Sequence, residues 1–143
     1  SLLSLSEYDF MFTDLSESNT MYHKMFGSHT QLVFGSKTET TLRMAARSYD
    51  GGPIVELARF NYGDWHNVKM VHKVTDNTDG LTSTGETEIY VDGTYLTTLS
   101  FNNYGGTGST TKNVDLRVMD WHFFGGNAHG TFYMDNWYYY LKN

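Results

Sequence analysis

The sequence predicts an all-β protein built as a two-sheet antiparallel β-sandwich. Apolar and polar residues alternate in short runs, and glycine, asparagine, aspartate, serine and threonine separate these runs, which is the pattern of half-buried strands joined by turns. The stretch Ile89-Tyr90-Val91 leads directly into Asp92-Gly93, a dipeptide that strongly favours a tight hairpin turn. With 11 tyrosines, 9 phenylalanines and a single proline, the composition also suits sheet packing.

The first strand is expected near residues 4–13, where Tyr8, Phe10 and Phe12 share one face. Asp50-Gly51-Gly52-Pro53 demands a turn, because glycine and proline supply the backbone conformations that turns require. Similar breakers separate the other expected strands, which cover residues 30–36, 40–49, 54–61, 65–74, 86–91, 95–101, 114–124 and 131–141. About ten strands at such intervals match a jelly roll, whose two sheets leave few exposed edges.

The chain of 143 residues fits a single domain, 1–143, and is long enough to bury a core. Because it has no cysteine, neither a disulfide framework nor a cysteine-based zinc site can form. The net charge of −6 argues against nucleic acid as a partner, and no apolar run is long enough to span a membrane. The abrupt start at Ser1-Leu2-Leu3 is expected of one module of a larger multidomain protein.

Two segments carry a resemblance to a known family. One is Trp65-His66-Asn67-Val68-Lys69-Met70-Val71 with the later Val91-Asp92-Gly93 turn, and the other is the closing strand Phe132-Tyr133-Met134-Asp135-Asn136-Trp137-Tyr138-Tyr139. They resemble the concanavalin A-like jelly rolls, a group that holds laminin-G-type domains, lectin-type sandwiches, glycoside hydrolases, polysaccharide lyases and carbohydrate-binding modules. The resemblance implies a concanavalin-like fold, a secreted or cell-surface location and a polysaccharide ligand.

The same resemblance implies a structural calcium ion. In those families an aspartate that matches Asp135 often binds calcium together with carboxylates of the first strand, which makes Glu7 and Asp9 the candidate partners. Calcium takes six to eight oxygen ligands, so backbone carbonyls and water would have to complete the site. In the alternative interpretation, Asp135 caps a bulge or accepts a hydrogen bond from a turn.

Sugar recognition needs a flat aromatic ring beside polar side chains, because a pyranose has an apolar face and a polar rim. Trp121-His122 runs into Phe123-Phe124-Gly125-Gly126, which resembles a strand on the substrate-binding face of family 16 glycoside hydrolases. Tyr49 and Tyr104 are further candidates near strand ends or in loops. The alternative for every one of these aromatics is simple packing within a β-rich core.

Cationic residues suggest which polysaccharide is bound. Arg43 and Arg47 share one strand face, Lys69 lies on a neighbouring expected strand, and Arg117 has the same parity as Trp121. If these faces coincide, they form a cationic surface suited to the carboxylate or sulfate groups of an acidic glycan. The alternative is an ordinary solvated sheet face.

We therefore expect a non-catalytic carbohydrate-binding module, with two other classes left open. A hydrolase of family 16 type needs two closely spaced glutamates on one strand, and the nearest match, Glu7-Tyr8-Asp9-Phe10-Met11-Phe12, lacks the second. A polysaccharide lyase needs a histidine or tyrosine base beside an arginine, and His72, Tyr139 and Arg47 supply these residue types. A laminin-G-like adhesion module that binds protein is the other alternative.

Overall fold

The computed structural model describes residues 2–15, 20–25, 30–35, 40–48, 52–76, 84–102, 119–124 and 130–142. Within these residues the chain is all-β, and none of them forms a helix that is long and apolar enough to cross a membrane. The strands are β1 (Leu2–Leu15), β2 (Thr20–Met25), β3 (Gln31–Gly35), β4 (Thr41–Arg47), β5 (Val55–Asn61), β6 (His66–Asp76), β7 (Thr84–Val91), β8 (Thr94–Asn102), β9 (Met119–Phe124) and β10 (Gly130–Lys142).

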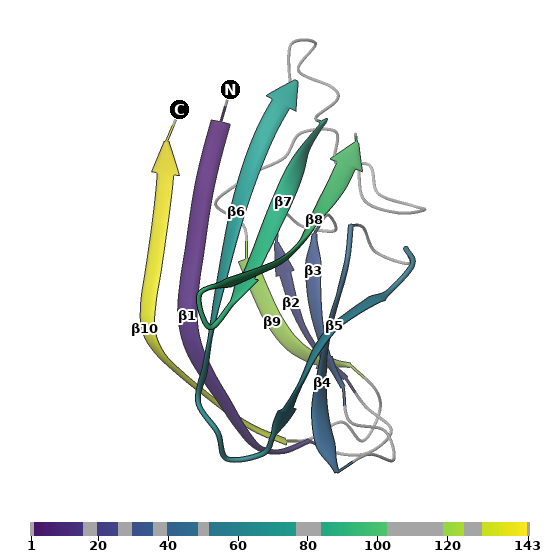
Figure 1. Cartoon of the computed structure of the whole chain (residues 1–143), viewed down its shortest axis with the longest axis vertical. Helices are drawn as coiled ribbons and strands as arrows, with labels where there is room; N and C mark the ends of the chain where they lie inside the picture. The colour runs from purple at the N-terminus through teal and green to yellow at the C-terminus, as the bar shows by residue number, and fades with distance from the viewer. Residues whose placement is uncertain are drawn as a thin grey trace.

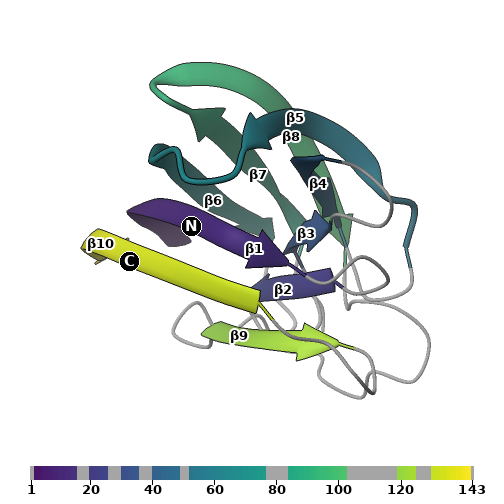
Figure 2. The same cartoon turned by 90° about the horizontal axis from the view of Figure 1, so that it is seen from below.

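The strands form two antiparallel sheets that pack face to face (Figures 1 and 2). Sheet A has the order β10-β1-β6-β7-β8, and sheet B has the order β5-β4-β3-β2-β9. The chain begins in sheet A, builds most of sheet B, returns to sheet A for β6 to β8, and finally adds one strand to each sheet. The predicted β-sandwich is confirmed, while the jelly-roll connectivity stays a prediction.

Aromatic side chains fill the space between the sheets. Tyr8, Phe10 and Phe12 of β1 are each at most 2% exposed, which confirms that the face they share is the core face. The ring centroids of Phe10 and Phe12 lie 5.3 and 5.1 Å from that of Phe34 in β3. These contacts join the two sheets directly, and each buried ring contributes roughly 1.5–3 kcal/mol of apolar burial.

A tight hairpin joins β7 to β8, as the Asp-Gly signal predicts. Asp92 and Gly93 both adopt positive φ angles, 49° and 80°, which is the combination that a two-residue type I′ turn requires. Aspartate tolerates this left-handed conformation and glycine adopts it without strain. The hairpin holds Asp92 close to the start of β6, where its backbone N–H donates to the carbonyl of Asn67 over 2.9 Å.

One end of the sandwich interior is polar. Thr30, which precedes β3, and Thr87 of β7 share a hydrogen bond of 3.0 Å that crosses from sheet B to sheet A. His72 of β6 lies 2.9 Å from the same Thr87 hydroxyl through Nδ1. All three side chains are fully buried. His72 therefore belongs to the core and has no route to an external substrate.

The expected strands correspond to all five strands of sheet A and to β3, β4, β5 and β9 of sheet B, but they omit β2. Its sequence, Thr20-Met21-Tyr22-His23-Lys24-Met25, mixes aromatic, basic and sulfur-containing residues without clear alternation. Tertiary pairing with β3 and β9 places it in the sheet. Local pattern is a weak guide to such a strand, because the strands on either side supply the hydrogen bonds that stabilise it.

Candidate functional site

The predicted cationic residues lie in two different sheets. Arg43 and Arg47 are on β4 in sheet B, where they alternate with the core residues Leu42 and Met44 and therefore face away from the core. Lys69 is on β6 in sheet A, between buried Val68 and Met70, and likewise faces outward. The outer faces of the two sheets point in opposite directions. The expectation of one cationic surface containing all of these residues is therefore wrong.

Sheet B nevertheless gathers three arginines on its outer face. Arg59 of β5 is the direct cross-strand partner of Arg43, and Arg47 follows on the same side of β4. Arg59 makes a bidentate ion pair with Glu56 at 2.6 and 3.2 Å. We call Arg43, Arg47 and Arg59 the arginine face. Arg59 was missed by sequence reasoning, because a bulge in β5 brings it into register with Arg43 and the sequence gives no sign of that bulge.

A polar side chain borders the arginine face on β3. Gln31 is the cross-strand partner of Arg47 and accepts a hydrogen bond of 2.7 Å from Arg47 Nε through its side-chain oxygen. Its amide nitrogen is buried and has no hydrogen-bond acceptor within the described part of the chain. Val33 and Ala45, which lie between the rows of the arginines, are fully buried. The arginines therefore border a part of sheet B that is covered from solvent, with Gln31 at one end of it.

Arg43 and Arg59 are direct cross-strand partners on β4 and β5. Glu56 pairs with Arg59, whereas no ion pair of Arg43 occurs among the described residues. Like charges directly opposite each other destabilise a sheet, by up to about 1 kcal/mol relative to a neutral pair. An anion placed between the two guanidinium groups would reverse the sign of this interaction.

The predicted aromatic site is only partly described. Trp121 and His122 lie on β9, and through β2 their backbone positions align with Leu32 and Val33 respectively. The side chains of β2 and β9 lie outside the described part of the chain. Tyr49, Tyr104 and Arg117 also fall outside the described residues.

Lys69 belongs to a separate group on the outer face of sheet A. Its ammonium lies 4.4 Å from the ring centroid of Tyr90 on β7, a cation–π contact. Nearby, the carboxylate of Glu88 accepts hydrogen bonds from Lys73 and from the Tyr90 hydroxyl. These bonds lower the pKa of Glu88 and raise the pKa values of Lys73 and Tyr90. The charges of Lys73 and Glu88 therefore neutralise each other in this group.

Asp9 and Asp135, two of the predicted calcium ligands, are direct partners across β1 and β10. The oxygens of Asp9 accept hydrogen bonds from the side-chain amides of Asn67 at 3.0 Å and Asn136 at 2.6 Å. Asp135 Oδ1 accepts from the backbone N–H of Asn136, whose φ is 53°, at a bulge in β10. Glu7 lies further along β1, opposite Tyr138 and Lys69.

This arrangement does not fit calcium as it stands. Both carboxylate oxygens of Asp9 already accept amide N–H groups, and the described residues contain no cluster of three or more histidine, aspartate or glutamate side chains that could hold a metal. The contacts favour the alternative in which Asp135 accepts a hydrogen bond at a bulge. Calcium binding stays a prediction, and the two bridging asparagines were not anticipated from sequence.

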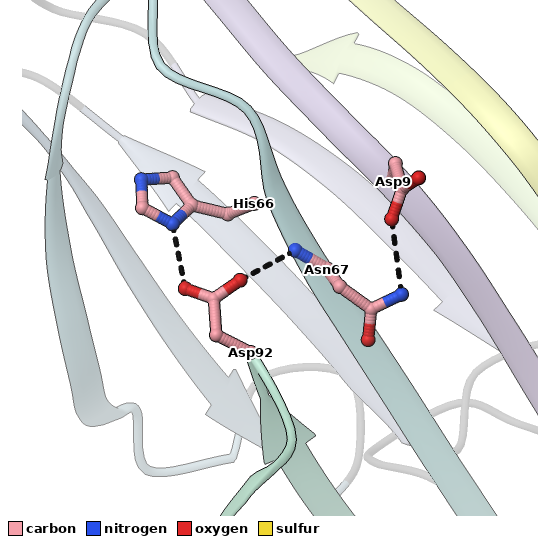
Figure 3. Close-up of polar contacts among 4 residues, drawn as sticks. All are labelled: Asp9, His66, Asn67 and Asp92. Carbon is pink, nitrogen blue, oxygen red and sulfur yellow. Dashed lines mark hydrogen bonds and ion pairs between the residues drawn. The ribbon is translucent and has the colours of Figure 1, made fainter.

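A second acidic side chain organises the hairpin, as Figure 3 shows. The carboxylate of Asp92 bonds to His66 Nδ1 at 2.7 Å and to the backbone N–H of Asn67 at 2.9 Å. Burial raises the pKa of Asp92, but the hydrogen bonds from Asn67 and His66 outweigh it, and the pKa is lowered overall. The imidazole also packs on the Phe60 ring at 4.3 Å between centroids. Asp92 therefore fixes the β7–β8 turn to the start of β6.

Comparison with known proteins adds no assignment. No protein-family model matches the chain, and no curated protein is significantly similar to it.

Proposed function

We propose that the chain is a non-catalytic carbohydrate-binding module that recognises an acidic polysaccharide through the arginine face. The cross-strand pair of Arg43 and Arg59 carries the proposal, because it places two like charges side by side on the outer face of sheet B. A protein that keeps such a pair gains from an external anion. Uronate carboxylates and sulfate esters are the anions that polysaccharides carry.

The spacing of the arginines suits a polymer better than a single small anion. Arg43 and Arg47 are four residues apart on one strand, which separates their Cα atoms by roughly 13 Å. Each guanidinium would bind a different acidic group along one glycan chain, with bidentate geometry at each contact. At the same end of the arginine face, the hydrogen bond from Arg47 Nε to the Gln31 side-chain oxygen fixes the orientation of the Arg47 guanidinium.

The proposal is tested by measuring both stability and binding of the Arg43→Gln variant. Removing one charge relieves the repulsion with Arg59, so we expect the free protein to become more stable by up to about 1 kcal/mol. The same change removes a charged contact to the ligand, so affinity for a polyuronate such as alginate or pectin should fall roughly 10-fold. Thermal unfolding and isothermal titration calorimetry measure the two effects.

Lys69→Gln provides the matched control, since it removes one positive charge from the opposite face. It should leave polyuronate affinity within about twofold, and binding of the native chain should weaken as salt rises. Equal, salt-insensitive binding to a neutral β-glucan would contradict the acidic ligand. A larger loss of affinity with Lys69→Gln than with Arg43→Gln would move the site to sheet A.

No described contact favours the lyase alternative. His72, one of the candidate bases, is fully buried beside Thr87. A general base must reach the proton that it abstracts, so this residue is unsuited to the role. Incubation with uronate polymers should therefore give no rise in absorbance near 235 nm, the signal of an unsaturated lyase product.

A further inference from the structure

The outermost strand of sheet A leaves apolar side chains exposed on both of its faces. Within the described part of the chain, β10 pairs with β1 on one side and with no strand on the other. Tyr138 and Tyr140 point to the outer face and are 53% and 44% exposed, while Trp137 and Leu141, on the alternate side, are 41% and 37% exposed. Such an edge is a template for pairing with another strand.

The charges of β10 are placed in a way that suits pairing with itself. Over Gly130–Lys142 the strand carries one acidic and one basic residue, Asp135 and Lys142. Both lie on the outer face of sheet A, because Asp135 is opposite Asp9 and Lys142 is opposite Leu3 in β1. The bulge at Asn136 makes this possible, since residues with odd and even numbers otherwise occupy opposite faces.

We propose that two copies of this chain associate through antiparallel pairing of their β10 strands about a two-fold axis at Tyr139. This register sets Tyr138 opposite Tyr140 of the second copy and Trp137 opposite Leu141. Directly opposed residues share a face in an antiparallel pair, and these partners do. The bulge at Asn136 adds one residue to the strand and shifts the register by one. Asp135 therefore lies opposite Lys142 of the second copy, on the outer face.

The pairing is complementary both in charge and in the positions of the apolar side chains. The two-fold axis creates the Asp135–Lys142 contact twice, so neither residue lies opposite a residue of the same charge. The apolar side chains that are exposed in one copy meet apolar side chains of the other, which is the composition expected of an isologous interface. The result is one continuous sheet made from both copies of sheet A.

This association goes beyond glycan binding and has a consequence for it. The two-fold axis of a side-by-side antiparallel strand pair runs perpendicular to the sheet, so the two copies present equivalent faces in the same direction. Both arginine faces would therefore point to the same side of the dimer. Two sites on one polymer chain bind with a higher overall affinity than either site alone.

Sedimentation equilibrium of the native chain tests the proposal, with a dimer of 16.4 kDa subunits expected. Asp135→Lys and Lys142→Asp should each lower the association constant about 10-fold or more, because each creates two repulsive contacts. The double variant Asp135→Lys/Lys142→Asp restores opposite charges and should recover dimerisation. Tyr95→Lys, at an equally exposed tyrosine on the other edge strand of sheet A, should have no effect.

A covalent test is independent of those charges. The chain has no cysteine, so Tyr139→Cys introduces a single thiol at the two-fold axis. With oxidised glutathione as the electron acceptor, we expect a disulfide-linked dimer, and much less of it from the control Thr98→Cys on β8. A monomeric native chain at every concentration, failure of the charge-swapped double variant to dimerise, or equal cross-linking of the two cysteine variants would overturn the proposal.

Discussion

At the scale of single residues, Asp92 has the clearest effect on pH dependence. Its folded-state pKa is lowered, so the stability that its carboxylate contributes is fully present above its ordinary pKa and is lost as the pH falls through the folded value. The side chain is half exposed, which limits the contribution. Its role is to hold the hairpin in place more than to add overall stability.

The variant Asp92→Asn separates this charge from the turn geometry, because asparagine also tolerates a positive φ. We expect the melting temperature to fall by at most about 2–4 °C near pH 7. The difference from the native chain should shrink as the pH falls below the ordinary aspartate pKa of about 4 and through the lower folded-state pKa, where the native carboxylate becomes protonated too. A difference that stays constant down to pH 2 would show that the charge of Asp92 has no part in it.

At the scale of elements, the bulge of β10 joins three strands of sheet A. Asn136 adopts a left-handed conformation and reaches Asp9 on β1, which in turn accepts a hydrogen bond from Asn67 on β6. Asn67 donates to Asp9 through its side chain and to Asp92 through its backbone, so the hairpin belongs to the same network (Figure 3). The network explains how Asp9 and Asp135 can lie opposite each other, since amide N–H groups donate to both carboxylates.

Two variants at the bulge distinguish backbone strain from the bridging contact. Asn136→Gly keeps the positive φ but loses the bond to Asp9, and should cost about 0.5–1.5 kcal/mol of unfolding free energy. Asn136→Ala loses the same bond and adds the strain of a left-handed residue, so it should cost roughly 1–2 kcal/mol more. Urea denaturation measures both. Equal values for the two variants would contradict the assigned role of the backbone.

The same network predicts how the chain responds to chelators. Because amide groups already satisfy Asp9, excess EDTA should leave the melting curve unchanged. The melting curve of the Asn136→Gly variant, measured as a control, should be equally insensitive to EDTA. A chelator-dependent fall in the melting temperature, restored by added calcium, would instead support the calcium ion that the family resemblance implies.

At the scale of the whole molecule, alternation and turn chemistry were sufficient to predict the sandwich. The core face of β1 and the Asp92-Gly93 hairpin follow from local pattern, and both are confirmed. The site was harder to predict, because it depends on which strands become neighbours. Parity correctly places Arg43 and Arg47 together, but it cannot show that Lys69 belongs to the other sheet or that a bulge brings Arg59 beside Arg43.

The two proposed sites occupy different sheets of the sandwich and are therefore compatible. The arginine face lies on sheet B, while the proposed self-pairing edge belongs to sheet A, so one does not block the other. Variants at Asp135 and Lys142 should therefore change the apparent affinity for a long polyuronate but not for a short oligosaccharide. Variants at Arg43 should weaken both.

Nuclear magnetic resonance with a short oligouronate tests the arginine face most directly. The account predicts that the side-chain Nε–Hε signals of Arg43, Arg47 and Arg59 shift on titration, together with backbone signals of β4 and β5. Signals of Lys69 and of the β6–β7 pair should stay in place. Shifts confined to sheet A, or no shifts at concentrations where calorimetry detects binding to the polymer, would contradict it.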